Sequence, residues 1–261
     1  RAVFEDSAEW PVFTSNDDNA TFYYDEVNPF VNYFGNILES AFTTTGRRPA
    51  EQIIGMMDAP GDPRISIWFK QASGYDGWKG AESGKEAQES DNSGVSLLNK
   101  ANLGDYASPY SHMKYDEVLF IFAEAIKRGW IDGGEQYYND AVRASIRFWS
   151  DVNKTGNPVS ESTVERFLAN IPYDGTLESI LDQKYVALFW TGFEAWHEYR
   201  RTGYPALVIG EGTQNDHVLP TRMAYPTIAI KTNPDNYAAE VARLQSVFRG
   251  ADDMKTPVWW S

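Results

Sequence analysis

Residues 176–201 set the strongest limit on the fold, because their middle, KYVALFWTGFEAW, is apolar on nearly every side. A helix that is apolar all round is stable in water only where other elements cover it. One helix is predicted from Thr176 to about Arg201, roughly 39 Å long at the usual rise per residue, with Gly203 as its stop. Such a helix needs neighbours on several sides, so we expect a mainly α fold.

Two further helices are predicted to form an antiparallel hairpin. The first opens at Ser108-Pro109, with serine as N-cap and proline at the first helical position, and it ends at Gly129. The second covers about 135–150. On both, apolar residues recur at helical spacing and give each helix one stripe to bury. The stripes are Tyr115, Val118, Leu119, Phe122 and Ile126 on the first helix, and Tyr138, Ala141, Val142, Ser145, Ile146 and Trp149 on the second.

Shorter elements are predicted along the rest of the chain. Residues 49–58 favour a short helix, and residues 59–69 a turn followed by a brief strand. The run STVE at 162–165 is a capping box that starts a third helix. Asn-Pro at 233–234 starts a late helix that runs to about residue 245. Most of residues 1–50 is predicted to be irregular.

Residues 71–107 are predicted to form a surface loop insertion, because 71–94 are rich in Gly, Ser and charge and almost lack aliphatics. Tyr75 and Trp78 lie in this loop without aliphatic neighbours that could form a core. A ring in such a loop either folds back on the body or faces a ligand. Sugar rings present C–H faces that stack on aromatics, and their hydroxyls suit polar neighbours such as Asp76 and Lys79.

The predicted ligand contacts therefore centre on this loop. Aromatics make up 15% of the chain, which includes nine Trp, so more rings are present than an ordinary core needs. For Trp68, at the loop entrance, core packing is the preferred interpretation and ligand contact the alternative. The candidate ligand-binding residues are Tyr75, Trp78, Trp68, Tyr33, Asp76 and Lys79, with Trp10 as a weaker candidate of the same kind.

Charge and composition exclude several classes of function. The net charge of −14 argues against nucleic acid and anionic lipid surfaces, which require clustered Lys and Arg. There are no cysteines, which excludes disulfides, thiolate chemistry and Cys-based zinc sites. No apolar run is long enough to span a membrane. The chain begins at Arg1 without a signal sequence, which suggests a mature product or a fragment.

Catalytic and metal-binding patterns are weak. Glu194 and His197 lie three residues apart, as in carboxylate-bridged di-metal sites, but such a site needs a second motif that His112 and His217 do not supply. A hydrogen-bonded structural pair is the preferred interpretation. With 37 acidic residues, some carboxylate pair is always available to a hydrolase, so that pattern carries little information. No cofactor is predicted, and a structural calcium ion is left open.

Arg200 and Arg201 end the long predicted helix. Cations at this end complement the helix dipole and the last carbonyls. We therefore interpret both arginines as structural, together with the Tyr204-Pro205 exit.

The segment ESILDQKYVALFWTGFEAWHEYRRTGYPAL at 178–207 resembles the most recognisable part of the SusD/RagB family of Bacteroidetes-type glycan-binding lipoproteins. Other segments resemble this family in the same order, so the resemblance covers nearly the whole chain. They are DPRIS at 62–66, SPYSHMKYDEVLFIFAEAIKRGWI at 108–131, RMAYP at 222–226, NPDNYAAEV at 233–241 and DDMKTPVWW at 252–260.

The resemblance implies an α-α superhelix with tetratricopeptide-like hairpins and no enzyme activity. It also implies a protein on the outer surface of the outer membrane that delivers oligosaccharide or a related nutrient to a SusC-like TonB-dependent barrel transporter. In the family, the 178–207 helix and its RR-x-GYP exit belong to the packed scaffold. Its ligand-binding aromatics lie mostly in variable loops, so no motif carries them over to this chain.

This sequence departs from the family in lacking the lipidated N-terminal Cys and the first half with its helical repeats. It is therefore expected to be the C-terminal portion, a single domain over 1–261, with membrane attachment only through a lipid anchor on the missing part. Two alternatives to the nutrient-binding function stay open. One is a glycoside hydrolase of helical fold, and the other is a scaffold that binds only protein.

Overall fold

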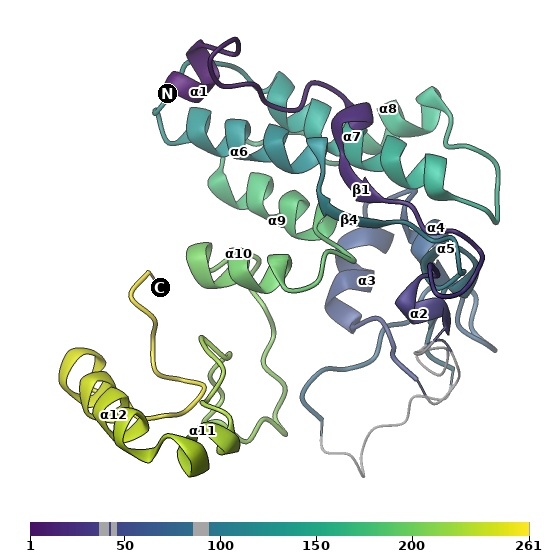
Figure 1. Cartoon of the computed structure of the whole chain (residues 1–261). Coiled ribbons are helices and arrows are strands. Elements are labelled where there is room, and N and C mark those ends of the chain that lie inside the picture. The colour runs from purple at the N-terminus through teal and green to yellow at the C-terminus, as the bar shows by residue number, and fades with distance from the viewer. Residues whose placement is uncertain (37–41, 43–45, 86–93, 261) are drawn as a thin grey trace. The chain divides into compact units, whose positions relative to one another are not determined.

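The computed structural model describes residues 1–36, 42, 46–85 and 94–260, which group into two compact units (Figure 1). Unit 1 comprises residues 1–81 and 91–195, and unit 2 comprises residues 82–90 and 196–261. The sequence predicts one domain over the same length. The division falls where the chain leaves the packed helices of unit 1 and enters a segment in which few of the described apolar side chains are buried.

The described residues of unit 1 are mainly helical, with two short antiparallel sheets in which β1 pairs with β4 and β2 with β3. The predicted mainly α class is confirmed. The helices are α1 (Ala2–Glu5), α2 (Tyr33–Asn36), α3 (Glu51–Asp58), α4 (Ile65–Trp68), α5 (Lys100–Leu103), α6 (Tyr115–Lys127), α7 (Gln136–Val152), α8 (Glu161–Asn170) and α9 (Leu177–Ala187), with a 3-10 turn η1 (Asn16–Asp18). The strands are β1 (Ala20–Phe22), β2 (Phe69–Lys70), β3 (Leu97–Leu98) and β4 (Tyr110–Met113).

α6 and α7 form the predicted hairpin (Figure 1). Every residue of the predicted α7 stripe is buried, and Gly129 ends the α6 turn with φ 71°, as expected. The predicted start at Ser108-Pro109 is wrong. Residues 110–113 are strand β4, because β1 pairs with their backbone, and α6 begins only after Lys114 in extended conformation. Long-range pairing here overrides a local helix-start signal.

The starts of the next two helices are partly as predicted. The helix expected from Thr176 does begin there, and Thr176 caps α9 by accepting a hydrogen bond from the Ser179 amide. The cap of α8 is Ser160, whose hydroxyl accepts from the Thr163 amide, and not Ser162. Glu165 does not reach back to close a capping box but pairs with Arg143 on α7. The predicted capping box is therefore wrong, and the cap lies two residues earlier than predicted. The predicted helix itself is confirmed as α8.

The single long helix predicted over 176–201 is broken into two. α9 ends at Ala187, and Trp190 and Gly192 both have φ 68°, a left-handed conformation that a right-handed helix cannot contain. The ammonium of Lys114, itself buried, donates to the Ala187 carbonyl at 2.7 Å and satisfies a group that the break leaves open. The apolar run is buried partly as a turn, which composition alone cannot distinguish from a helix.

The interior of unit 1 has two clusters of apolar side chains, and α7 and α9 contribute to both. A fully buried ion pair, Asp62–Arg64 at 2.6 Å, fastens the segment before α4 to these helices. The Arg64 guanidinium also donates to the Ser145 hydroxyl on α7 and to the Gln183 side chain on α9. The DPR segment therefore acts as an internal cross-link of the helices.

Two predicted segments differ from the structure near this core. Residues 65–68 form the one-turn helix α4 rather than a strand, and the strand is limited to Phe69–Lys70. Residues 95–103, placed in the predicted surface loop 71–107, carry side chains that are buried, including Leu98 and Leu103. The side chain of Leu98 lies in the interior because strand β3 pairs with strand β2. The short helix at 49–58 is confirmed as α3.

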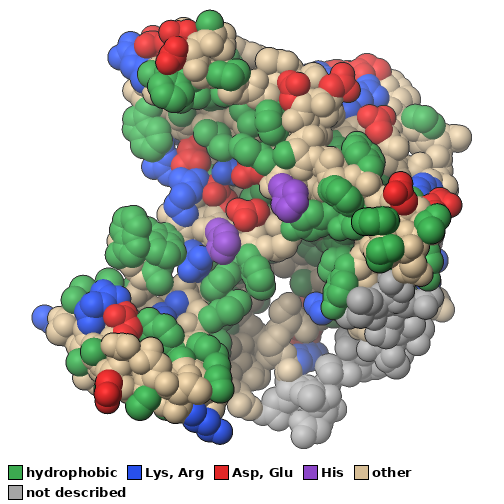
Figure 2. Space-filling view, viewed as in Figure 1, with side chains coloured by type: hydrophobic (Ala, Val, Ile, Leu, Met, Phe, Trp, Pro, Cys, Tyr) green, Lys and Arg blue, Asp and Glu red, His purple; other side chains and the backbone are tan. Residues whose placement is uncertain are grey.

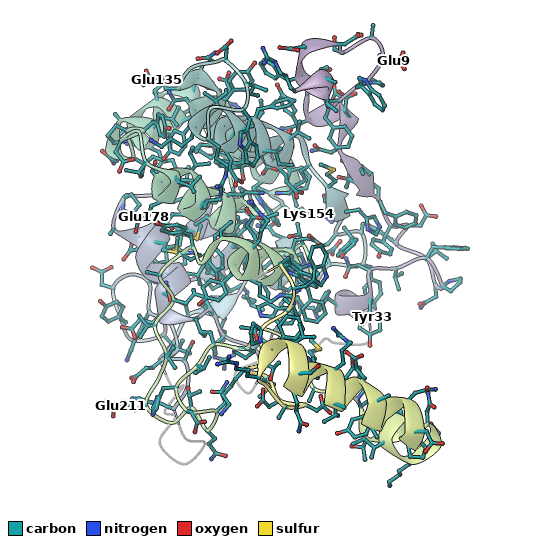
Figure 3. The ribbon with its side chains drawn as sticks, turned by 90° about the vertical axis from the view of Figure 1, so that its left-hand side faces the viewer. Glu9, Tyr33, Glu135, Lys154, Glu178 and Glu211 are labelled. Carbon is teal, nitrogen blue, oxygen red and sulfur yellow. The ribbon has the colours of Figure 1, made fainter. Side chains whose placement is uncertain are left out.

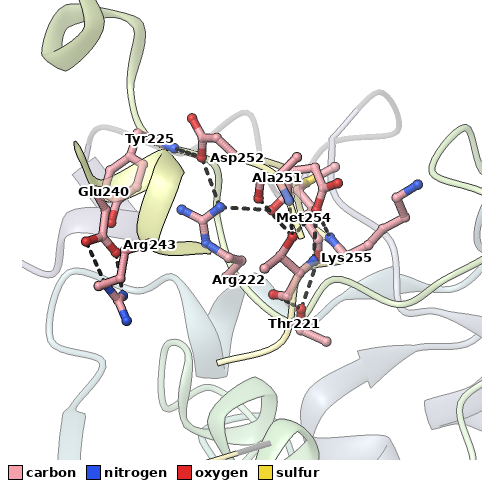
Figure 4. A network of polar contacts seen from close by, with 11 residues as sticks. Thr221, Arg222, Tyr225, Glu240, Arg243, Ala251, Asp252, Met254 and Lys255 are labelled. Carbon is pink, nitrogen blue, oxygen red and sulfur yellow. Dashed lines mark hydrogen bonds and ion pairs between the residues drawn. The ribbon is translucent and has the colours of Figure 1, made fainter. Parts of the chain in front are cut away.

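Unit 2 contains α11 (Thr227–Thr232) and α12 (Pro234–Phe248), and α10 (Glu194–Thr202) enters it at residue 196. The predicted Asn-Pro start of the late helix is confirmed, with Asn233 as N-cap. A polar network joins the loop at Thr221–Tyr225 to the loop at Asp252–Met254 (Figure 4). In it, Asp252 accepts from the Arg222 guanidinium and from the Tyr225 amide, both at 2.9 Å.

The two arginines that end α10 have the structural role predicted for them. Arg200 lies over the rings of Trp196 and Trp260, 4.0 Å and 5.3 Å from their centroids, and donates to the Thr221 carbonyl. Arg201 pairs with Glu198 on the same helix. Gly203, at φ 78°, ends the helix, as expected.

Candidate functional site

The described part of the predicted binding loop, residues 71–85, follows β2 directly. The β2–β3 ladder fixes its entrance, since Phe69 pairs with Leu98 and Lys70 with Leu97. Beyond Lys70 the sequence offers Gly, Ser and charged residues, which lack the apolar side chains needed to continue a buried strand.

The far end of the loop is fastened by two sets of backbone contacts. The Lys79 amide donates to the Ser96 hydroxyl at 3.1 Å, and the Ser96 amide donates back to the Lys79 carbonyl at 2.8 Å. Ala81 bonds to the backbone on both sides of Ala50. A side chain at Gly80 would collide with the backbone of Glu51, so only glycine permits this approach.

Between these contacts the chain makes one closed turn. The Ala72 amide donates to the Gly77 carbonyl, and the Tyr75 amide donates to the Ala72 carbonyl. Gly74 and Gly77 have positive φ values of 74° and 127°, which other residues rarely adopt. Tyr75 lies in this turn with 56% of its surface exposed. Its ring is therefore available to a ligand on a backbone that is already ordered.

The two tryptophans predicted as ligand contacts face the protein interior to different degrees. The prediction of Trp68 as a ligand contact is wrong. Trp68 is fully buried and stacks on Phe189 with ring centroids 4.2 Å apart, so it offers no surface to a ligand. The reason is α4, whose single helical turn directs Trp68 inward. Trp78 is half-buried and packs against the same core cluster. It folds back on the body, with part of its ring still exposed.

The other predicted site residues are exposed. Asp76 and Lys79 are on the same loop as Tyr75, so charged groups accompany the exposed ring. Tyr33 is exposed but belongs to α2, a different segment of unit 1 (Figure 3). Trp10 is exposed in the N-terminal segment. Several exposed rings in residues 22–30 were not predicted as contacts, although turn residues interrupt this run of aromatics and Val27 is its one aliphatic residue.

Glu194 and His197 are both exposed on α10. Across the described ranges, no group of three or more His, Asp or Glu side chains is arranged to hold a metal ion. Within these ranges, Glu194 and His197 therefore do not belong to a group of side chains that could bind a metal ion. The interpretation of the pair as structural stays a prediction.

One carboxyl group in unit 1 has a strongly altered acidity. Burial, reinforced by the neighbouring charges of Glu178 and Asp174, raises the pKa of Asp182 to about 6. Its Oδ1 atom is buried without a hydrogen-bond partner among the described residues. Asp182 lies on α9 and not on the Tyr75 loop. A raised pKa is useful to a general acid, but it is also what burial alone produces.

The arrangement around Tyr75 is therefore suited to binding rather than to proton chemistry. It combines one exposed ring, an exposed carboxylate at Asp76, an exposed ammonium at Lys79 and a preformed backbone. These groups can stack on a flat apolar face and exchange hydrogen bonds with hydroxyls.

Comparison with known proteins shows the family and the fold of this chain. A family profile described as "Starch-binding associating with outer membrane", of SusD-like type, matches residues 1–226. The chain belongs to this SusD-like family. No curated protein matches it in sequence.

Solved structures of SusD-like proteins have the same fold. A chitin-binding protein is 25% identical with a TM-score of 0.80, over 97% of this chain and 57% of its own. A SusD homologue from Bacteroides fragilis is 28% identical with a TM-score of 0.78, over 95% of this chain and 58% of its own. One from Bacteroides thetaiotaomicron is 26% identical with a TM-score of 0.72, over 99% of this chain and 58% of its own. The expected SusD-like helical architecture is thereby confirmed.

This SusD-like chain spans somewhat over half the length of these structures. The family is one that associates with the outer membrane, by its own description. Within the part of the chain that the structure describes, every helix is too short or too polar to cross a bilayer.

Proposed function

We propose that this chain is a non-catalytic glycan-binding part of an outer-membrane uptake complex, which delivers oligosaccharide to a SusC-like TonB-dependent transporter. The observation that carries the proposal is the exposed ring of Tyr75 on a loop fastened at both ends, in a chain of SusD-like type. A similar structure, 25% identical, is that of a chitin-binding protein, so chitin fragments belong among the first ligands to try.

Recognition would rest on stacking supported by hydrogen bonds. The face of the Tyr75 ring receives the C–H face of a pyranose, while Asp76 accepts from sugar hydroxyls and Lys79 donates to them. The hydrogen bonds of Ala72 and Tyr75 hold the turn before any ligand arrives. Binding therefore costs little additional ordering of the loop, which favours affinity.

The non-catalytic part of the proposal is supported by the site itself. In sequence, the charged side chains nearest to Tyr75 are one carboxylate, Asp76, and one ammonium, Lys79, whereas a glycoside hydrolase needs two carboxyl groups that flank the scissile bond. We place the complete protein at the cell surface of the outer membrane because its family is described as associated with that membrane. Transfer of the glycan to a barrel transporter is the step by which such binding would serve uptake.

The decisive experiment compares the parent with Tyr75→Ala by isothermal titration against neutral oligosaccharides, including chitohexaose and maltoheptaose. We expect the variant to lose about 1–3 kcal/mol of binding free energy, by analogy with stacking on aromatic side chains. Trp130→Ala is the matched control, because Trp130 is also an exposed ring of unit 1, in the α6–α7 turn. Unchanged affinity of Tyr75→Ala would place the site elsewhere.

Two further measurements separate the alternatives. Release of reducing ends during incubation with the same glycans, abolished by Asp182→Asn or another single carboxyl change, would identify a hydrolase instead. Tryptophan fluorescence that ignores every glycan but shifts with a barrel transporter would identify a protein-binding scaffold. Trp78→Ala is less informative than Tyr75→Ala, because Trp78 also packs against the core.

A further inference from the structure

A second group of exposed rings lies in unit 1, on residues 20–34. This segment, ATFYYDEVNPFVNYF, has six aromatic side chains, and four of them are more exposed than buried. Large rings normally lie in the interior, since each can remove a large apolar area from water. The exposed rings are Phe22 (51%), Tyr23 (71%), Phe30 (61%) and Tyr33 (52%).

Both ends of this segment are fixed to the body of unit 1. At the start, β1 pairs with β4, and the Thr21 and Ser111 hydroxyls are 2.8 Å apart. At the end, Asn32 is buried, its side chain donating to the Ser108 carbonyl at 2.8 Å and its amide to the Tyr106 carbonyl at 2.7 Å. The rings between these points are therefore carried by a backbone with defined attachments.

The packing of one neighbour shows that the exposed rings are not needed for the core. Phe34, in the same segment, packs on Trp190 with ring centroids 4.8 Å apart and joins the core cluster. Phe22 has Tyr24 against its edge and remains half-exposed. Hydrophobic side chains gather on this face of unit 1 over β1 and β4 (Figure 2). Exposed rings that gather in one attached segment indicate a binding surface.

The residues among the rings indicate the chemistry of the ligand. Asp25 and Glu26 are exposed within the loop, and Tyr23 and Tyr33 add phenolic hydroxyls. The core of a protein–protein interface is usually depleted of charged residues, which argues against a protein partner. A net charge of −14 disfavours polyanions. Rings interspersed with acceptors suit a neutral, hydroxyl-rich chain.

We propose that residues 22–33 form a second sugar-binding surface, which takes neutral oligosaccharide independently of the Tyr75 loop. This inference rests on the proposed function and adds a second place of contact to it. A glycan is bound through the exposed rings of Tyr23, Phe30 and Tyr33, with Asp25 and Glu26 accepting from its hydroxyls.

The test uses the full chain and titrates chitohexaose and maltoheptaose into four proteins: the parent, Tyr75→Ala, Tyr23→Ala/Phe30→Ala, and the control Trp130→Ala. Thermal unfolding confirms that each variant folds, which we expect because all the altered rings are exposed. In the Tyr23→Ala/Phe30→Ala variant, binding at the second surface should be roughly tenfold or more weaker while the Tyr75 site is kept, so one of the two sites of the parent should be lost from the titration, whereas Trp130→Ala should keep both.

Each outcome decides a different question. If the parent binds and the Tyr23→Ala/Phe30→Ala protein binds equally well, the second surface is refuted while the proposed function stands. If the parent binds none of the glycans, the proposed function fails and this inference fails with it. If the double variant changes only the molecular mass measured by light scattering, the surface is a contact between copies of the chain, which also refutes the inference.

Discussion

Unit 1 buries aromatic and aliphatic side chains along α6, α7, α8 and α9, whereas Pro205 and Leu244 are the two buried apolar side chains among the described residues from 196 to 260. Unit 2 is instead joined by Arg200 over its tryptophans and by the Arg222–Asp252 network. A large apolar interior supplies most of the free energy of folding, so the two units should differ in stability and not only in shape.

The largest effect should come from breaking the internal cross-link of unit 1. Arg64→Ala leaves Asp62 charged and fully buried, and should cost about 3–5 kcal/mol of unfolding free energy. Chemical denaturation followed by circular dichroism measures it. Arg143→Ala, which removes exposed ion pairs of the same unit, should cost under about 1 kcal/mol. Equal losses in the two variants would contradict the structural role of Arg64.

A smaller and more local effect is expected in unit 2. Arg222→Ala leaves Asp252, which is only 9% exposed, without its ion-pair partner, and should cost about 2 kcal/mol. Hydrogen exchange should show faster opening of α12 while the amides of α7 stay protected. Arg243→Ala, whose pair with Glu240 is exposed, serves as the control and should change little. Loss of protection throughout both units would show that they unfold together.

The third prediction compares how two carboxyl groups, Asp182 in unit 1 and Asp216 in unit 2, make stability depend on pH. The folded pKa of Asp182 is raised from 3.8 to about 6, so the folded state binds more protons in that window and stability falls as pH rises through it. Asp182→Asn should therefore stabilise unit 1 by about 1 kcal/mol at pH 7, after allowing for solvent screening, and by almost nothing at pH 4.

Asp216 in unit 2 provides the opposite sign. A hydrogen bond from Lys255 lowers the pKa of Asp216, so its ionised form contributes stability that is present at neutral pH and lost in acid. Asp216→Asn should thus slightly weaken unit 2 at pH 7. Thermal unfolding at both pH values checks the pair. The same sign in both variants would contradict the assigned causes.

The smallest effect should come from removing an exposed ring. Trp259→Ala in unit 2 and Trp130→Ala in unit 1 should each change the unfolding free energy by less than about 0.5 kcal/mol. If Trp259→Ala were markedly destabilising, unit 2 would depend on apolar packing at its C-terminal end, and the contrast between the units would be weaker than described. Differential scanning calorimetry is sensitive enough to decide.

Sequence patterns predicted the parts of unit 1 that depend on local periodicity. The α7 stripe from Tyr138 to Trp149 is buried throughout, because one helix face must meet the core wherever its neighbours lie. The break after Ala187 was not predictable, since a buried turn and a buried helix require the same apolar composition. Strand β4 replaced a predicted helix start because its partner, β1, lies about 90 residues earlier in the chain.

The candidate site was predicted in part for similar reasons. Tyr75 is exposed because the residues around it offer nothing to pack against, a property that is visible in the sequence. For Trp68 the preferred core role is confirmed and the ligand contact is wrong; the contacts that bury it, a single helical turn and stacking on Phe189, could not be predicted because Phe189 is distant in the chain. The exposure of Phe30 and Tyr23 likewise depends on where Asn32 and β1 are attached.

The contacts that attach the Tyr75 loop to the rest of the protein lie on either side of residues 73–76. The entrance is held by β2, and the exit by Ser96 and by the close approach of Gly80 to Glu51. Under the proposed function, substitutions between these points alter which glycan is bound and leave the packed helices of unit 1 unchanged. Ligand choice and stability can then change separately during evolution.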